Sequence, residues 1–133
     1  MTSRQNKLIE AAREARGQAV APYSGFAVGA AIEARGGKIF TGCNVESASY
    51  GLTMCAERVA VFKALSESAR EFVRAAVVAD SEALTAPCGA CRQVLWEHCG
   101  DIEIVLSNLS GREEAVRLSE LLPRPFDGSG LNS

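Results

Sequence analysis

The sequence predicts an α/β fold: a three-layer α/β/α sandwich around a mixed five-stranded sheet. Segments with apolar residues at helical spacing alternate with short apolar runs that are typical of strands. Their order along the 133 residues is α-β-β-α-β-α-β-β, followed by one short helical segment. Such an order indicates a sheet covered by helices. The length suits one domain, which we expect to span residues 1–133, with a loose Gly- and Ser-rich tail over 127–133.

The N-terminal part predicts one helix and a pair of strands. Thr2 and Gln5 have the spacing of a capping box, so a helix should begin there and stop near Gly17. Its apolar positions are Leu8, Ile9, Ala12 and Ala15. A strand is expected over Phe26 to Ile32, and a Gly-Gly turn leads into a second strand over Ile39 to Val45.

Helices and strands alternate in the rest of the chain. Thr53 can cap a helix from about Met54 to Leu65. Pro87 suits the start of a helix over Cys88 to His98. The remaining expected segments are three strands and a short final helix: Phe72 to Ala79, Ile102 to Leu106, Ala115 to Leu118 and Ser119 to Leu122.

Charge and hydropathy argue against several classes of function. Fourteen Lys and Arg against 16 Asp and Glu give a net charge of −2, whereas nucleic-acid-binding domains usually carry a basic stripe. The longest apolar run, Phe26 to Ile32, is far shorter than the roughly 18 residues of a membrane span. Charged residues also interrupt the N-terminus, where a signal peptide would be apolar. We therefore expect a cytoplasmic protein that binds neither nucleic acid nor membranes.

The composition includes five cysteines: Cys43, Cys55, Cys88, Cys91 and Cys99. An odd number argues against a disulfide framework. In a reducing cytosol they can be metal ligands, a redox pair or small buried apolar side chains. Packing is the favoured interpretation for Cys43 and Cys99. His98 lies in the last turn of its expected helix and is not expected to bind metal.

Three of the cysteines have the spacing of a metal site. Cys88 and Cys91 form a C-x-x-C at an expected helix start, so their sulfurs share one face of the first turn. Cys55 lies in the first turn of another expected helix, and the partial positive charge of both helix starts favours thiolates. Three ligands leave one position of a tetrahedral zinc ion open, as catalytic sites require. Glu57 is then expected to accept and pass on a proton.

Four further side chains complete the candidate site. Zinc with three thiolates keeps a net negative charge, which Arg58 and Arg92 are expected to offset by hydrogen bonds to sulfur. Asn44 and Glu46, at positions i and i+2 of an expected strand, point to the same face. An amide beside a carboxylate suits a sugar hydroxyl, which donates to one and accepts from the other. Gly29 is expected to permit close packing of strands.

Two motifs carry a resemblance to a known family: Cys55-Ala56-Glu57-Arg58 and Pro87-Cys88-Gly89-Ala90-Cys91-Arg92-Gln93. Further matching stretches follow the family's order along the chain: Tyr23 to Ala31, Gly42 to Glu46, Ala48 to Tyr50, Leu121 to Pro123 and Phe126. Together they resemble the small, three-cysteine, homotetrameric cytidine deaminases over nearly the whole chain.

The resemblance implies an enzyme of pyrimidine salvage with one zinc ion per chain. Cytidine or deoxycytidine and water would give uridine or deoxyuridine and ammonia, with Glu57 moving the protons and the cysteines of the two motifs binding zinc. It also implies a homotetramer in which Phe126 and the segment Ala48 to Tyr50 help to complete sites across subunits. The implied substrate contacts are Phe26, Asn44, Glu46, Ala56, Tyr50 and Phe126.

Some departures and alternatives remain. Ser47 stands where the family commonly has asparagine, and Arg124-Pro125 stiffens the stretch before Phe126. The alternative functions are a deaminase of an analogue such as blasticidin S, a non-catalytic zinc-stabilised binding module and a dithiol redox enzyme. Deaminases of nucleic acid usually use histidine as the first ligand, and free cytosine would leave Asn44 and Glu46 without a sugar. A monophosphate would meet an acidic protein without an evident phosphate loop.

Overall fold

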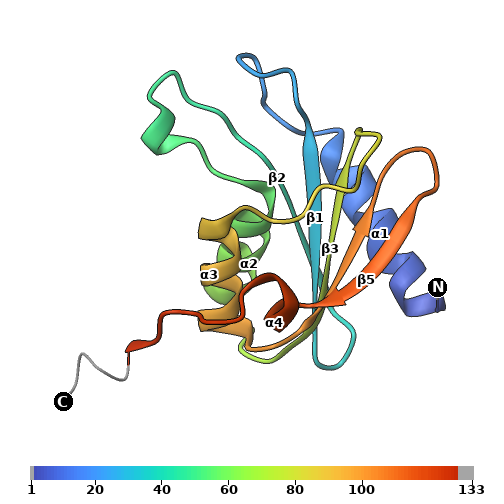
Figure 1. The fold of residues 1–133 in the computed structure, drawn as a ribbon, viewed down its shortest axis with the longest axis vertical. Helices are drawn as coiled ribbons and strands as arrows, with labels where there is room; N and C mark the ends of the chain where they lie inside the picture. The colour runs from blue at the N-terminus through green and yellow to red at the C-terminus, as the bar shows by residue number, and fades with distance from the viewer. Residues whose placement is uncertain (1, 129–133) are drawn as a thin grey trace.

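A mixed five-stranded sheet forms the middle layer of the computed structural model, which describes residues 2–128 (Figure 1). The strands lie in the order β2-β1-β3-β4-β5. β3 and β4 pair in parallel, and the other neighbours pair antiparallel. The strand bounds are β1 (Val28–Ala34), β2 (Ile39–Cys43), β3 (Phe72–Ala79), β4 (Glu103–Ser107) and β5 (Glu113–Arg117).

Helices cover both faces of the sheet. In Figure 1, α1 (Ser3–Arg16) lies on one face, and α2 (Ala56–Ser66) and α3 (Gly89–Cys99) lie together on the other. A short 3₁₀ turn, η1 (Tyr50–Leu52), precedes α2, and α4 (Leu118–Leu121) follows β5. The predicted three-layer sandwich is therefore confirmed.

Strand β3 shows how the two hydrophobic cores divide. Ala75 and Val77 belong to the larger core under α2 and α3, whereas Ala76 and Val78 belong to the core under α1. Successive side chains of a strand point to opposite faces, and here both faces are covered. The strand is consequently a continuous apolar run in the sequence.

Two glycines let helices lie directly against the sheet. A Cβ at Gly29 would lie 1.9 Å from the carbonyl oxygen of Ala12 in α1. A Cβ at Gly42 would lie 2.5 Å from the carbonyl oxygen of Ala56 in α2. The expectation that Gly29 permits close packing of strands is therefore wrong: the absence of a side chain at Gly29 makes room for the backbone of α1.

The start of α2 differs from the expected one. Cys55, and not Thr53, is the N-cap residue. The Thr53 hydroxyl accepts a hydrogen bond from the backbone N–H of Ser47, 2.9 Å away, and Met54 pairs with Val45 through two backbone hydrogen bonds. These contacts hold residues 53 and 54 in the loop, so α2 begins at Ala56 and Cys55 lies at its N-terminus.

Two strands also differ from their expected bounds: β1 begins at Val28 instead of Phe26, and β2 ends at Cys43 instead of Val45. Asn44 and Glu46 therefore follow the strand and do not lie at positions i and i+2 within it.

Two helix boundaries match their sequence signals. Thr2 and Gln5 form the predicted capping box, and Gly100, with a φ of 73°, ends α3. β5 begins at Glu113 instead of Ala115 because it is an exposed edge strand whose charged residues hide the apolar pattern. The assignment of residues 1–133 to one domain stays a prediction, and most of the expected tail, residues 129–133, lies outside the described residues.

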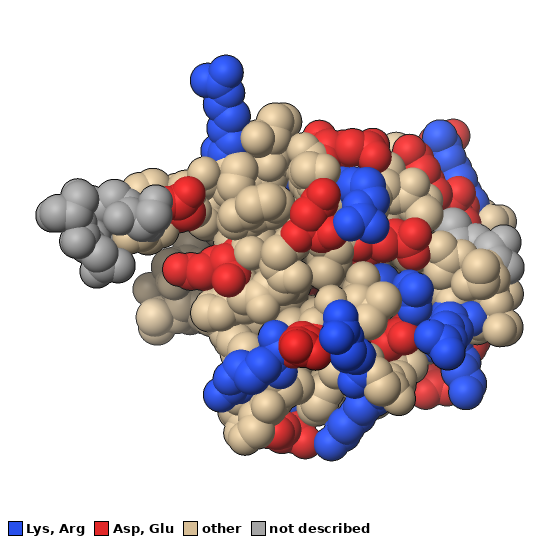
Figure 2. Space-filling model, turned by 90° about the horizontal axis from the view of Figure 1, so that it is seen from below, with Lys and Arg blue, Asp and Glu red and all other residues tan. Residues whose placement is uncertain are grey.

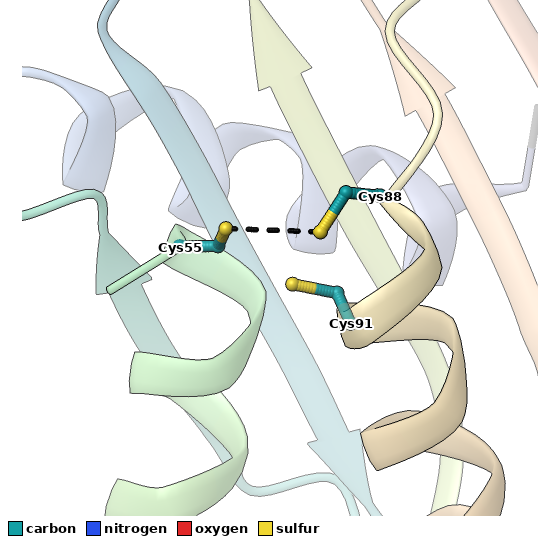
Figure 3. Close-up of side chains that lie close together, drawn as sticks. All are labelled: Cys55, Cys88 and Cys91. Atoms are coloured by element: carbon teal, nitrogen blue, oxygen red, sulfur yellow. Dashed lines mark hydrogen bonds between the residues drawn. The ribbon is translucent and has the colours of Figure 1, made fainter. Parts of the chain in front are cut away.

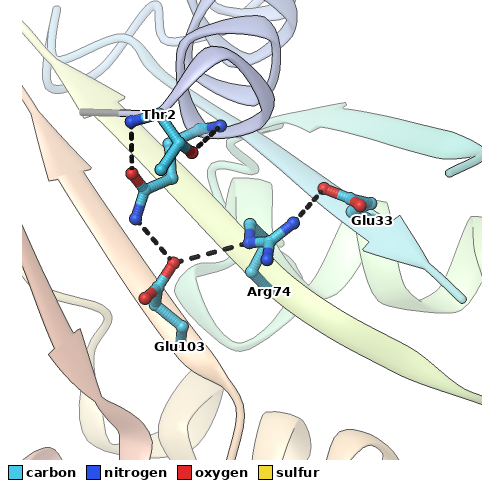
Figure 4. A network of polar contacts seen from close by, with 5 residues as sticks. Thr2, Glu33, Arg74 and Glu103 are labelled. Atoms are coloured by element: carbon cyan, nitrogen blue, oxygen red, sulfur yellow. Dashed lines mark hydrogen bonds and ion pairs between the residues drawn. The ribbon is translucent and has the colours of Figure 1, made fainter.

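A polar network joins α1 to three strands (Figure 4). Arg74 of β3 donates to Glu33 of β1 at 2.8 Å, and its Nε lies 3.4 Å from Oε1 of Glu103 in β4. Gln5 donates to the same Glu103 oxygen at 2.8 Å and accepts from the backbone N–H of Thr2. The helix cap and the sheet are thereby connected through charged side chains.

The surface carries charges of both signs. On the face shown in Figure 2, Lys and Arg side chains lie among Asp and Glu side chains. Among the helices of residues 2–128, none is long and apolar enough to cross a membrane.

Candidate active site

Three cysteines meet where α2 and α3 begin (Figure 3). Cys55 is the N-cap residue of α2, Cys88 is the N-cap residue of α3, and Cys91 lies in the first turn of α3. Their sulfurs lie within 4.8 Å of one another, and the Cys55 and Cys88 sulfurs are 3.9 Å apart. Across residues 2–128, this is the group of His, Cys, Asp or Glu side chains placed to hold a metal ion.

The donor set fits a zinc ion. A tetrahedral zinc with bonds of about 2.3 Å separates its sulfur ligands by roughly 3.8 Å, close to the distance between Cys55 and Cys88. All five cysteines of the chain are free thiols. Three thiolates at two helix N-termini also gain from the positive ends of the helix dipoles. The cluster can therefore hold zinc and leave a fourth position open.

The sulfurs share their protons unequally. A hydrogen bond with Cys91, supported by Arg58, lowers the pKa of Cys55 to about 5. The same hydrogen bond, together with burial, raises the pKa of Cys91. The shared hydrogen bond thus shifts the pKa values of the two thiols in opposite directions, and a bound metal ion would displace the thiol protons of its ligands.

Glu57 lies in the first turn of α2 and is 7% exposed. Burial, with a smaller contribution from the charge on Cys55, raises the pKa of Glu57 to about 7. A carboxyl with such a pKa can accept and release a proton at neutral pH. Glu57 and the candidate ligand Cys55 line the same cavity.

A cavity of about 270 Å³ opens beside the cysteines. It brings together seven of the residues singled out in the sequence: Phe26, Asn44, Glu46, Cys55, Ala56, Glu57 and Cys88. Its volume is near the lower limit of ordinary small-molecule sites, and a single chain supplies all of these groups.

Asn44 and Glu46 are held in place by hydrogen bonds. Asn44 accepts from the backbone N–H of Val28 at 2.9 Å and donates to the Phe26 carbonyl at 2.8 Å. Glu46 accepts from two backbone N–H groups and from the Ser24 hydroxyl. The hydrogen bonds from Ser24 lower the pKa of Glu46, so its carboxylate stays ionised. Each group keeps hydrogen-bonding capacity for a further partner.

Arg58 and Arg92 have different hydrogen-bond partners: a sulfur for Arg58 and backbone carbonyl groups for Arg92. Arg58 donates from Nη2 to the Cys55 sulfur at 3.4 Å. Arg92 was expected to contact sulfur, but its Nε donates to the Pro87 carbonyl at 2.7 Å and its Nη1 to the Leu121 carbonyl at 2.8 Å. Adjacent residues of a helix do not face the same way, so Arg92 points away from the face that carries Cys91.

Two expected substrate contacts lie outside this cavity. Tyr50 is 83% exposed and lines a neighbouring hollow that shares Ser24, Glu46 and Thr53 with the cavity. Phe126 is 66% exposed, and its backbone exchanges two hydrogen bonds with the Gln93 side chain.

The remaining candidates also lie apart from the metal cluster. Cys43 and Cys99 are partly buried, and burial raises the pKa of Cys99 to about 12. Cys99 packs against the larger core, as expected for an apolar side chain. His98 lies 3.8 Å from Glu97 of its own helix.

The cavity also contains residues that the sequence did not single out as contacts: Ser24, Val28, Thr53, Met54, Val77, Thr85 and Ala86. Thr85 and Ala86 directly precede Pro87 and the C-x-x-C motif, and this position next to the motif could have indicated that they line the site. Val28 and Val77 come from strands of the sheet, so only the pairing of β1 with β3 reveals that they share the cavity.

Comparison with known proteins gives a consistent result. The family model for the cytidine and deoxycytidylate deaminase zinc-binding region matches residues 2–107. A cytidine deaminase of Sporosarcina psychrophila is 49% identical over 95% of this chain and 93% of its own. The crystal structure of cytidine deaminase from Burkholderia pseudomallei is 50% identical, with a TM-score of 0.89 over 95% of this chain and all of that chain.

A more distant relative, a blasticidin-S deaminase of Bacillus cereus, is 29% identical over 74% of this chain and 76% of its own. The family match covers both halves of the metal cluster, with Cys55 from α2 and Cys88 and Cys91 from α3. The chain therefore belongs to the cytidine and deoxycytidylate deaminase family.

Proposed function

We propose that this protein is a zinc-dependent cytidine deaminase of pyrimidine salvage, which converts cytidine or deoxycytidine and water to uridine or deoxyuridine and ammonia. The observation that carries this proposal is one cavity lined both by Glu57 with Cys55 and Cys88 of the cysteine cluster and by a sugar-compatible pair, Asn44 and Glu46. Relatives of nearly equal length that are named cytidine deaminases support the same substrate.

The proposed chemistry replaces the amino group at C4 of the base by oxygen. Cys55, Cys88 and Cys91 would hold zinc, which as a Lewis acid activates a water molecule toward C4. Glu57 would accept a proton from that water and deliver it to N3 of the base. As it does so, the water oxygen would bond to C4. Glu57 would then move the second proton of that oxygen to the amino nitrogen, so that the C4–N bond breaks, the C4 carbonyl forms and ammonia leaves. Burial raises the pKa of this carboxyl, which makes Glu57 a stronger proton acceptor than an exposed glutamate.

The proposed substrate is a nucleoside. The second amide N–H of Asn44 can donate to a ribose or deoxyribose hydroxyl, and the Glu46 carboxylate can accept from it. Phe26 and Ala56 add apolar surface to the same cavity. An ionised Glu46 beside the sugar disfavours a substrate that carries a phosphate there.

The proposed assembly is a homotetramer located in the cytoplasm. Tyr50, Leu52 and Phe126 are 83%, 72% and 66% exposed, and a second subunit would cover such apolar side chains. Free cysteines and a thiolate metal site suit a reducing compartment. Light scattering should give about four times the chain mass of 14.1 kDa, and a monomeric mass would contradict the assembly.

An absorbance assay tests the activity directly. Zinc-loaded protein should convert cytidine to uridine, a chelator should stop the conversion, and added zinc should restore it. A panel of cytidine, deoxycytidine, cytidine monophosphate, cytosine and blasticidin S then compares kcat/KM. Failure of the zinc-loaded protein to deaminate cytidine would overturn the proposal, and a higher kcat/KM for blasticidin S would favour the analogue deaminase instead.

A further inference from the structure

The loop over residues 80–88 connects β3 to α3 without forming a helix or a strand. Thr85 and Ala86 of this loop line the cavity, and the loop ends at Cys88 of the metal cluster. Any movement of the loop would therefore change the cavity wall and the position of one sulfur. Side chains from outside the loop hold its two ends.

Asn108 holds the first end. This residue follows β4 and is 2% exposed, and its Nδ2 donates to the carbonyl oxygens of Ser81 and Glu82 at 3.0 and 3.3 Å. Its Oδ1 accepts from the backbone N–H groups of Ser110 and Arg112 at 3.0 and 2.9 Å. The buried amide thus joins the β4–β5 turn to the loop, a role that needs a donor and an acceptor on one side chain.

Ser81 transmits this contact toward the cavity. Its hydroxyl lies 3.0 Å from the Thr85 hydroxyl, and Thr85 lines the cavity. The chain of contacts therefore runs from Asn108 through Ser81 to Thr85. The loop belongs to no helix or strand, so no regular backbone hydrogen bonds hold it in place.

Arg92 holds the second end. Its Nε donates to the carbonyl of Pro87 at 2.7 Å and its Nη1 to the carbonyl of Leu121 in α4 at 2.8 Å. Pro87 is fully buried and directly precedes Cys88. The rigid guanidinium thus fixes the peptide that leads into the first cysteine of the C-x-x-C motif.

We infer that Asn108 and Arg92 are positioning residues that fix the two ends of the loop over residues 80–88, and so place the cavity wall and Cys88. The inference rests on the proposed function where it concerns substrate binding. The two ends have separable effects: Asn108 sets the wall against which the nucleoside lies, and Arg92 sets the sulfur that binds the metal.

The test compares Asn108→Asp with Arg92→Lys. Asn108→Asp keeps the acceptor and removes the donor, so KM for cytidine should rise about 10-fold while kcat changes less and zinc is retained. Arg92→Lys keeps the charge and loses the rigid fork, so the chelator concentration that removes half of the zinc should fall roughly 10-fold. The matched controls on the exposed surface of α1 are Asn6→Asp and Arg4→Lys, which should change neither quantity.

The inference is overturned if both variants fold and behave as their controls do. If Asn108→Asp does not fold, Ser81→Ala takes its place, because it removes the hydroxyl contacts with Thr85 and with the Ala83 carbonyl of the same loop but keeps the backbone carbonyl that Asn108 binds. This variant should raise KM roughly two- to tenfold. An unchanged KM in Ser81→Ala would contradict the role of this end.

Hydrogen–deuterium exchange separates a failure of this inference from a failure of the proposed function, because it needs no substrate. Asn108→Asp should speed exchange in the peptide covering 81–88 and leave α1 unchanged. Unchanged exchange in that peptide would overturn the inference even in an active enzyme, whereas faster exchange in a protein that does not deaminate cytidine would overturn only the proposed function.

Discussion

The guanidinium of Arg58 donates a hydrogen bond to the sulfur of Cys55, 3.4 Å away, at the start of α2. The two residues are three positions apart in the sequence, so the contact is local and forms without a bound ligand. It places a permanent positive charge beside Cys55, whose sulfur lies within 4.8 Å of the other two, and next in the chain to the buried Glu57. The site is thereby prepared for an excess of negative charge.

Replacing Arg58 by glutamine should weaken zinc binding. The variant removes the charge that stabilises the Cys55 thiolate, and the loss of such a partner typically costs 10- to 100-fold in metal affinity. Competition with a chromogenic chelator measures the effect. Lys63→Gln, which removes an exposed positive charge from the same helix, should bind zinc as the wild type does. Equal zinc retention in both variants would show that Arg58 does not support the thiolates.

Glu57→Gln should retain zinc and lose most of the deaminase activity. The amide fills the same space but cannot accept a proton from water, and a positioned proton-transfer group typically contributes 10²–10⁴-fold to the rate. Metal analysis and the absorbance assay check the two halves of this prediction. Glu67→Gln, at the exposed end of α2, is the control and should be fully active. A zinc-loaded Glu57→Gln protein that works at the wild-type rate would contradict the proton-transfer role.

The metal cluster could be predicted from the sequence because its geometry is mostly local. A C-x-x-C at a helix start brings two sulfurs to one face of one turn, and this needs no knowledge of the tertiary fold. The position of Cys55 at the N-terminus of α2 could also be predicted, because a helix was expected to begin close to it, although the sequence pointed to Thr53 as the N-cap residue. The fold class followed from the same periodicities.

Features that depend on distant residues could not be predicted in this way. Thr53 fails as a cap because its hydroxyl bonds to Ser47, and Arg92 turns to Pro87 and Leu121 because α4 lies beside α3. The contact of Asn108 with the loop gave no signal, since the two carbonyl groups to which its amide donates are 26 and 27 residues away in the sequence. Side chains that satisfy distant backbone groups are visible only once the loops have been placed.

Gly29→Ala should destabilise the fold. A methyl group there would lie 1.9 Å from the carbonyl oxygen of Ala12, so α1 must move away from β1. Overpacking of this kind typically costs 1–3 kcal/mol, and a backbone neighbour leaves little room to adjust. Urea unfolding measures the change. Gly51→Ala is the control, because its Cβ would meet nothing within 4 Å. Equal stability of the two variants would mean that α1 shifts without cost.

Arg74→Met should destabilise the protein more than the loss of a surface ion pair does. Glu33 is 4% exposed and Arg74 is its charged partner at 2.8 Å, so the variant leaves a buried carboxylate without compensation (Figure 4). Breaking such a pair typically costs about 3–5 kcal/mol in the free energy of unfolding, against about 0–1 kcal/mol for an exposed pair. Arg35→Met is the matched control, because the side chains of Arg35 and its partner Glu71 are 78% and 68% exposed. If urea unfolding gives the same small loss for both variants, water must reach the Glu33 carboxylate at little cost. The double variant Glu33→Leu/Arg74→Met distinguishes the pair itself from its broken form, and it should recover most of the stability that Arg74→Met alone removes, because no unpaired charge remains at Glu33.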